Sequence, residues 1–137
     1  MSAPLPAQIN NVLRITPPEK IAGKVNETVA ADFSVSLRQG YHTNSNKPND
    51  EFLIPLRLTW EDGAAKAGEV TFPKPQMERF AFSQNPVSVF TGDFKLQTKF
   101  KILSTGVMNG KLRYQACSDK ACLPPRTLDV KLQVEAH

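Results

Sequence analysis

The sequence predicts a single all-β domain, built as a β-sandwich of seven or eight short strands. Apolar residues recur at every second position over much of the chain, which is typical of strands with one face in a core and one face in water. Helix signals are weak, because the 11 prolines are scattered and no apolar stripe follows helical spacing. Short strands separated by turn residues at this spacing favour a sandwich.

Three segments alternate most clearly, and we expect each to be a strand: residues 31–38, 94–102 and 128–136. In the last of these, Leu128 to Ala136 places apolar and polar side chains on opposite faces. Shorter runs predict further strands at residues 52–60, 69–72, 86–90 and 111–117. Glycine, proline, asparagine and aspartate predict turns at residues 39–40, 47–50, 61–63, 91–93 and 108–110.

The length and composition fit one globular domain over residues 1–137, with residues 1–15 as a loosely packed lead-in. Hydrophobic residues make up 40% of the chain and charged residues 22%, which is ordinary for a folded protein. No apolar run approaches the roughly 18 residues that span a membrane. Met1 to Ala7 lacks the features of a signal peptide, so the sequence leaves open a cytosolic protein or one whose signal has been removed.

The basic residues do not predict a nucleic-acid partner, although the formal net charge is +4. Lys95, Lys99 and Lys101 share one face of an expected strand, and the other basic residues are spread along the chain. No basic cluster is interleaved with aromatic residues, as RNA-binding sheets require. We therefore expect a solvated, solubilising surface.

Two segments break the alternating pattern. Residues 40–46 follow a clear strand with polar and aromatic side chains, among them His42. The simplest interpretation of His42 is a solvated histidine in a turn; the alternative is a proton acceptor that tunes a thiolate. Residues 76–85 read as a loop but contain Phe80 and Phe82. Phenylalanines in a loop either pack as a satellite core or cover something.

Only two cysteines occur, Cys117 and Cys122, and three interpretations compete. A zinc site is poorly supported, because the chain offers only two histidines to complete four ligands. A structural disulfide would close a hairpin, but so short a loop removes little entropy from the unfolded chain. A redox pair at a hairpin tip is accessible to another protein, and Lys120 would favour a thiolate while Asp119 would oppose it. Chemistry alone favours the redox pair by a narrow margin.

The segment Tyr114-Gln115-Ala116-Cys117, followed by Cys122-Leu123-Pro124-Pro125, resembles the signature of the N-terminal periplasmic domain of DsbD-type thiol:disulfide interchange proteins. Residues 40–44, and the stretch at residues 50–55, also resemble parts of that family. The similarity extends from about Thr28 to the C-terminus. It implies an immunoglobulin-like sandwich with a redox-active cysteine hairpin at one loop end.

The resemblance also implies roles for individual residues. Cys117 and Cys122 match the redox pair, with Cys122 forming the mixed disulfide to a partner and Cys117 resolving it. Tyr41, His42, Tyr114 and Pro124 would form the environment of the pair, and Phe80 or Phe82 would supply the aromatic cap that shields it. The sequence departs from the family's pattern in having Arg79 where the cap carries acidic residues, and His42 and Asn44 where aromatic residues stand.

The implied activity is protein-disulfide reduction by thiol–disulfide interchange, with electrons taken from a thioredoxin-like donor domain and passed to periplasmic thiol–disulfide or cytochrome c maturation proteins. Two sulfurs hold two electrons, so we expect no metal and no other cofactor. The resemblance further implies a periplasmic location. We expect a monomer by default, not itself inserted in the membrane, and the sequence leaves open whether the chain belongs to a larger protein tethered to the inner membrane. Two alternatives stay open: a non-catalytic interaction domain with a structural disulfide, and a stand-alone reductase dedicated to cytochrome maturation.

Overall fold

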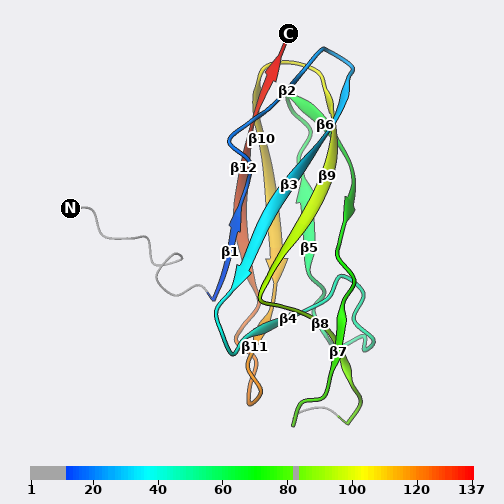
Figure 1. The fold of residues 1–137 in the computed structure, drawn as a ribbon, viewed down its shortest axis with the longest axis vertical. Coiled ribbons are helices and arrows are strands. Elements are labelled where there is room, and N and C mark those ends of the chain that lie inside the picture. The colour runs from blue at the N-terminus through cyan, green and yellow to red at the C-terminus, as the bar shows by residue number, and fades with distance from the viewer. Residues whose placement is uncertain (1–11, 82–83) are drawn as a thin grey trace, which may run out of the picture.

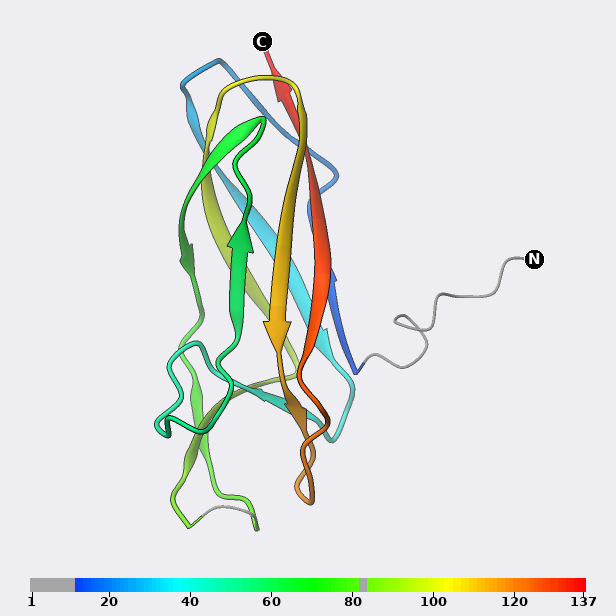
Figure 2. The same ribbon diagram turned by 180° about the vertical axis from the view of Figure 1, so that it is seen from behind.

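The computed structural model describes residues 12–81 and 84–137, and within these residues it contains twelve strands and no helix. Two four-stranded sheets face each other as a sandwich, with the first sheet in front in Figure 1 and the second in front in Figure 2. The first sheet has the order β1 (Leu13–Thr16), β3 (Thr28–Leu37), β9 (Asp93–Ile102) and β6 (Ala65–Thr71). The second has the order β2 (Ile21–Gly23), β12 (Arg126–Ala136), β10 (Gly106–Tyr114) and β5 (Arg57–Trp60).

A third, smaller sheet lies at the end of the sandwich opposite the C-terminus (Figure 1). Its order is β11 (Ala116–Cys117), β4 (His42–Asn44), β8 (Val87–Thr91) and β7 (Gln76–Glu78). β10 leads directly into β11, and β8 leads directly into β9, so this sheet is continuous in sequence with both layers of the sandwich. The all-β fold predicted from the sequence is confirmed for the described residues.

The three strongest predicted strands are confirmed as β3, β9 and β12, and the alternation follows burial in each of them. In β12, Val130, Leu132 and Val134 are buried while Lys131 and Gln133 are exposed. Burying one face of each strand removes apolar area from water at about 25 cal/mol per Å², which is the main favourable term in folding. The alternation of apolar and polar residues in the sequence therefore indicates which face of each strand packs against the core.

An aromatic cluster occupies the middle of the core. Phe33 of β3 and Phe100 of β9 are fully buried, and their ring centroids lie 6.4 Å apart. The ring of Trp60 from β5 lies 5.4 Å from Phe33 and 5.1 Å from Phe100, so it bridges the two facing sheets. Tilted and edge-on arrangements at such distances are the favourable ones for aromatic pairs.

The turn predicted at residues 108–110 is wrong, because these residues lie inside β10. A Cβ added to Gly110 would come within 2.7 Å of the Trp60 ring, so glycine is required there for close packing and not for a turn. The chain reverses instead between β9 and β10, where Leu103 and Ser104 both donate backbone hydrogen bonds to the carbonyl of Ala64.

Two other predicted strands have different limits. Of residues 52–60, only Arg57–Trp60 is a strand, because the preceding residues form a turn in which the Asp50 carboxylate accepts a hydrogen bond from the Phe52 amide. The strand expected at residues 69–72 begins earlier, as β6, and an irregularity between Ala67 and Val70 interrupts its alternation.

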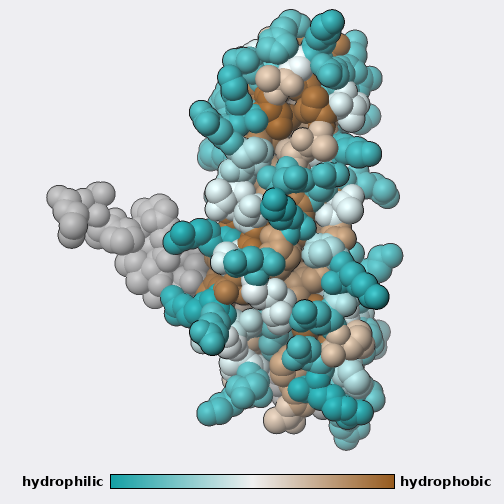
Figure 3. All heavy atoms as spheres, in the orientation of Figure 1, coloured by the Kyte–Doolittle hydropathy of each residue, from teal (hydrophilic) through white to brown (hydrophobic). Residues whose placement is uncertain are grey.

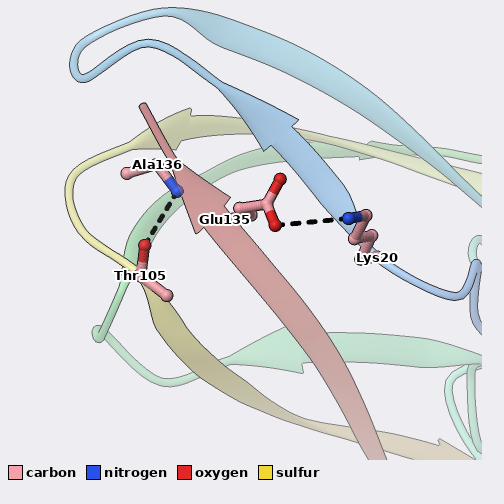
Figure 4. A network of polar contacts seen from close by, with 4 residues as sticks. All are labelled: Lys20, Thr105, Glu135 and Ala136. Carbon is pink, nitrogen blue, oxygen red and sulfur yellow. Dashed lines mark hydrogen bonds and ion pairs between the residues drawn. The ribbon is translucent and has the colours of Figure 1, made fainter.

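The chain's first described residues belong to the first sheet. Leu13 pairs with Leu37 and is 1% exposed, so the part of the expected lead-in from Leu13 to Ile15 is a packed strand; residues 1–11 lie outside the described residues. At the other end, the last residues of β12 are tied down by two contacts, Lys20 to Glu135 and the Ala136 amide to the Thr105 hydroxyl (Figure 4).

The outer face of the first sheet is solvated, as predicted. Lys95, Lys99 and Lys101 are all exposed on β9. The face that β3 and β9 present in Figure 1 is mostly hydrophilic or intermediate, with apolar side chains visible between the polar ones (Figure 3).

Candidate functional site

The third sheet brings the cysteine segment against residues that were expected to form a turn. β4 pairs with β11 so that Cys117 lies opposite His42 and Ala116 lies opposite Thr43. All three residues of β4 are buried. The interpretation of His42 as a solvated turn histidine is therefore wrong: it lies in a central strand and is 3% exposed.

Alternation divides this small sheet into two faces with different surroundings. Thr43, Phe90 and Ala116 share one face by register, and Phe90 and Ala116 belong to the main hydrophobic core. His42 and Cys117 share the other face, outside that core. The cysteine is thus attached to the sandwich through the backbone ladder while its side chain lies in a separate, buried environment.

Cys117 and Cys122 form a disulfide across a hairpin, with an S–S distance of 2.02 Å and a Cα–Cα distance of 3.9 Å. The two cysteines differ sharply in access, because Cys117 is 1% exposed and Cys122 is an exposed residue. In the turn between them, the Ser118 hydroxyl oxygen accepts hydrogen bonds from the backbone amides of Lys120 and Ala121. One cysteine therefore lies at the surface on a braced turn, and the other is buried.

The chain leaving the hairpin is held against the strand that entered it. Leu123 donates a backbone hydrogen bond to Ala116, and the Gln115 side chain donates another to the Leu123 carbonyl. Pro124 follows as an exposed residue. Tyr114 lies in the main core, 1% exposed, and burial raises the pKa of its hydroxyl above the ordinary value. Tyr114 thus anchors the base of the hairpin rather than lining its surface.

An aromatic ring covers the buried side of the site. Phe80, which follows β7, stacks on the His42 imidazole with ring centroids 4.1 Å apart and planes inclined by 11°. The Arg79 guanidinium donates a hydrogen bond to the Gln84 carbonyl, across the loop that contains Phe80. Phe82, the other candidate for the cap, lies outside the described residues.

A cleft of about 430 Å³ opens beside this stacked pair. Its lining includes Tyr41, which is half-buried, together with His42 and Phe80. Three charged residues also line it: Arg38, Glu78 and Asp119, the last from the cysteine hairpin. Burial lowers the pKa of His42 below its ordinary value, so the imidazole is neutral at pH 7. Of the described residues of the predicted site, Tyr41, His42 and Phe80 thus line this cleft. Cys117 and Cys122 do not line it, although Asp119 of their hairpin does and Cys117 pairs with His42.

Within residues 12–81 and 84–137, no three His, Cys, Asp or Glu side chains gather as metal ligands. Over the same residues, no helix has the length and apolar character needed to cross a membrane.

Comparison with known families identifies the family of the chain. The model of the N-terminal domain of the thiol:disulfide interchange protein DsbD matches residues 14–134, which is nearly the whole chain. The chain belongs to this family. The immunoglobulin-like sandwich that the cysteine motif implied is therefore confirmed, and the disulfide is the feature that connects this DsbD N-terminal domain to redox chemistry.

Solved structures of the same kind of domain are similar. The N-terminal periplasmic domain of ScsB from Proteus mirabilis superposes with a TM-score of 0.64 at 17% identity, over 88% of this chain and 44% of that one. The reduced DsbD N-terminal domain from Neisseria meningitidis superposes with a TM-score of 0.60 at 14% identity, over 94% of this chain and 89% of that one. The chain thus spans less than half of the ScsB chain. No curated protein sequence matches it.

Two strands of the third sheet were missed by sequence reasoning. One is β7, which lies within residues 76–85, where the sequence had predicted a loop; the other is β4. β4 was not predicted, because its three buried residues are all polar and give no alternating apolar signal. The resemblance had drawn attention to residues 40–44, but only the pairing of His42 with Cys117 shows that a histidine is buried next to the buried cysteine.

Proposed function

We propose that this domain exchanges thiols and disulfides with partner proteins through Cys122, with Cys117 as the resolving cysteine. The observation that carries the proposal is the difference in exposure between the two sulfur-bearing residues on a braced hairpin. Exchange requires a thiolate to reach one sulfur directly, and a buried partner sulfur then completes the reaction within the same protein. Family membership supports the same chemistry.

The proposed cycle balances without any cofactor. A thiolate of the donor attacks the Cys122 sulfur, a mixed disulfide forms, and Cys117 leaves as a thiolate that takes up a proton. A second donor thiolate attacks the donor sulfur of the mixed disulfide and releases Cys122. The donor loses two electrons and two protons, and the domain gains them as a dithiol. Reduction of a target disulfide is the reverse sequence.

We propose a thioredoxin-like domain as the electron donor and periplasmic thiol–disulfide proteins as the targets. The end of the sandwich that carries the hairpin supports such docking, because Asp119 of the cysteine hairpin lines the same cleft as His42 and Phe80. We place the domain in the periplasm, where a cysteine pair can alternate between disulfide and dithiol. There it acts as a monomer within a larger, membrane-tethered protein.

The test is the reduction potential of the Cys117–Cys122 pair, measured by equilibration with glutathione or dithiothreitol and thiol trapping. A reversible midpoint between about −180 and −270 mV is expected, as for proteins that exchange disulfides. The measurement is paired with stopped-flow exchange against a reduced thioredoxin-like protein. A midpoint well below about −300 mV, together with slow exchange, identifies a structural disulfide in a non-catalytic interaction domain and rejects the proposal.

The stacked ring of Phe80 is expected to act as a cap that limits access to the disulfide. Phe80→Ala removes a ring whose centroid lies 4.1 Å from that of His42. We expect a small thiol to reduce the disulfide of this variant several-fold to about tenfold faster, which corresponds to an activation free energy lower by up to about 1.4 kcal/mol. Met77→Ala, at an exposed residue of the adjacent strand β7, is the matched control. Equal rates for the wild type and Phe80→Ala would mean that the ring is only packing.

A further inference from the structure

We propose that His42 is the proton acceptor for the Cys117 thiol in the step that resolves the mixed disulfide. The inference rests on the proposed exchange function and adds a specific acid–base residue to it. Cys117 must lose a proton before it can attack, because the thiolate and not the thiol is the nucleophile. At a residue that is 1% exposed, water has little access to take that proton.

The strand register puts the imidazole beside the thiol. His42 of β4 and Cys117 of β11 are directly opposite in an antiparallel pair. Their side chains therefore point to the same face of the sheet, and facing Cβ atoms in such pairs lie about 4.5–5.5 Å apart. An imidazole at that separation has the reach to accept a hydrogen bond from the sulfur. On the other side of His42 the register partner is Thr91 of β8, which is not ionisable at neutral pH.

The stacked cap lies over a face of the imidazole and not along its edge. The Phe80 and His42 planes are inclined by only 11°, so the phenyl ring covers a face of the imidazole. Both ring nitrogens lie at the edge, in the plane of the ring, where a neighbouring strand residue approaches. Phe80 thus keeps water from one face of His42 without blocking the proton transfer.

The surroundings also keep His42 in the form that accepts a proton. Burial lowers its pKa, so the imidazole remains neutral through pH 7 and offers one nitrogen lone pair. The charged residues that share its cleft are Arg38, Glu78 and Asp119, of both signs, and Arg79 precedes the stacked ring. His42 therefore stays unprotonated, and able to accept a proton, at pH values at which an ordinary histidine is already charged.

The resolving step is balanced as follows. Cys122 is joined to a partner sulfur, and the Cys117 thiol transfers its proton to His42. The Cys117 thiolate attacks the Cys122 sulfur, the Cys117–Cys122 bond forms, and the bond to the partner breaks. The partner leaves as a thiolate that takes the proton from the imidazolium, directly or through solvent, so that His42 returns to its neutral form. The partner sulfur is reduced and the domain is oxidised.

The test separates the two steps with dithiobis(nitrobenzoate) added in stoichiometric amount to the reduced domain in a stopped-flow instrument. Attack by Cys122 releases one thionitrobenzoate, and resolution by Cys117 releases the second. His42→Phe retains an aromatic ring that can stack against Phe80. At pH 7 we expect this variant to slow the second release at least about tenfold, which is within the range of general-base effects, and to change the rate of the first release by less than twofold. His137→Phe, which removes the exposed terminal histidine, is the matched control.

The pH profile distinguishes a proton acceptor from a packing residue. In the wild type the second release should be nearly independent of pH above neutrality, because both the neutral imidazole and the thiol are present throughout. In His42→Phe it should rise about tenfold for each pH unit below the thiol pKa, because solvent must then supply the thiolate. Parallel profiles in the two proteins would overturn the inference.

A measurement on the wild type keeps the inference testable if the variant does not fold. The His42 ring proton signals are titrated by NMR in the disulfide and dithiol forms, and the dithiol form should titrate at lower pH because a donated S–H bond favours neutral imidazole. Identical titrations would reject the contact.

If the wild type releases no second thionitrobenzoate and does not exchange with a thioredoxin-like protein, the proposed function itself fails. If the wild type releases the second thionitrobenzoate and exchanges with a thioredoxin-like protein, and His42→Phe does so at the same rates, only the proposed role of His42 is wrong.

Discussion

Cys117→Ser is expected to accumulate a stable mixed disulfide through Cys122, whereas Cys122→Ser should form essentially none. The partner in this test is a thioredoxin-like protein whose second cysteine is replaced by serine and whose remaining cysteine is activated as a thionitrobenzoate disulfide. The reason is access: Cys122 is exposed, whereas Cys117 is 1% exposed and pairs with His42, on which Phe80 stacks. With Cys117 and the partner's second cysteine both removed, neither protein has a thiolate that can resolve the intermediate. Non-reducing electrophoresis and mass spectrometry of the trapped complex measure both outcomes, and each variant should lose more than a hundredfold in steady-state exchange.

Loss of the disulfide should not by itself unfold either variant. The two cysteines are five positions apart, and closing so short a loop contributes only about 2 kcal/mol through the unfolded chain. Ser118→Ala, in the same hairpin, keeps both sulfurs and serves as the control for local disturbance of the turn. Comparable trapping of Cys117 in the Cys122→Ser variant would contradict the assignment of the attacking sulfur.

The sequence was most informative where a strand buries only one face. β3, β9 and β12 alternate over nine or more residues because one face of each meets the core and the other meets water. Such a pattern requires no knowledge of the strand's neighbours. By contrast, Gly110 belongs to a run that looks like a turn, and only the Trp60 ring packed against it explains why a glycine stands inside a strand.

The candidate site was only half predictable for a related physical reason. The cysteine pair and its flanking prolines form a local motif, and the disulfide lies where that motif indicated. The burial of His42 depends on its pairing with β11 and on the ring of Phe80, both distant in sequence. A three-residue strand carries no periodicity by which to detect it, so its role emerges only when the third sheet is assembled.

Phe33→Ala is expected to lower the free energy of unfolding by about 3–5 kcal/mol, since it removes a fully buried ring and leaves a cavity between the two main sheets. The lost contacts include the rings of Trp60 and Phe100, at 5.4 and 6.4 Å. For a domain of this size the melting temperature should fall by roughly 10–20 °C. Trp60 is the only tryptophan in the chain, so its intrinsic fluorescence reports the transition directly.

Ser34→Ala is the control, because Ser34 is the next residue of β3 and points to solvent, where substitutions usually change stability by no more than about 0.5 kcal/mol. Below its melting transition, Phe33→Ala should exchange disulfides at the wild-type rate, since Cys117 and His42 lie on the face of the third sheet that does not join the main core. A stable variant that has lost exchange would mean that core packing positions the cysteines. Unchanged stability would mean that the ring does not hold the sheets together.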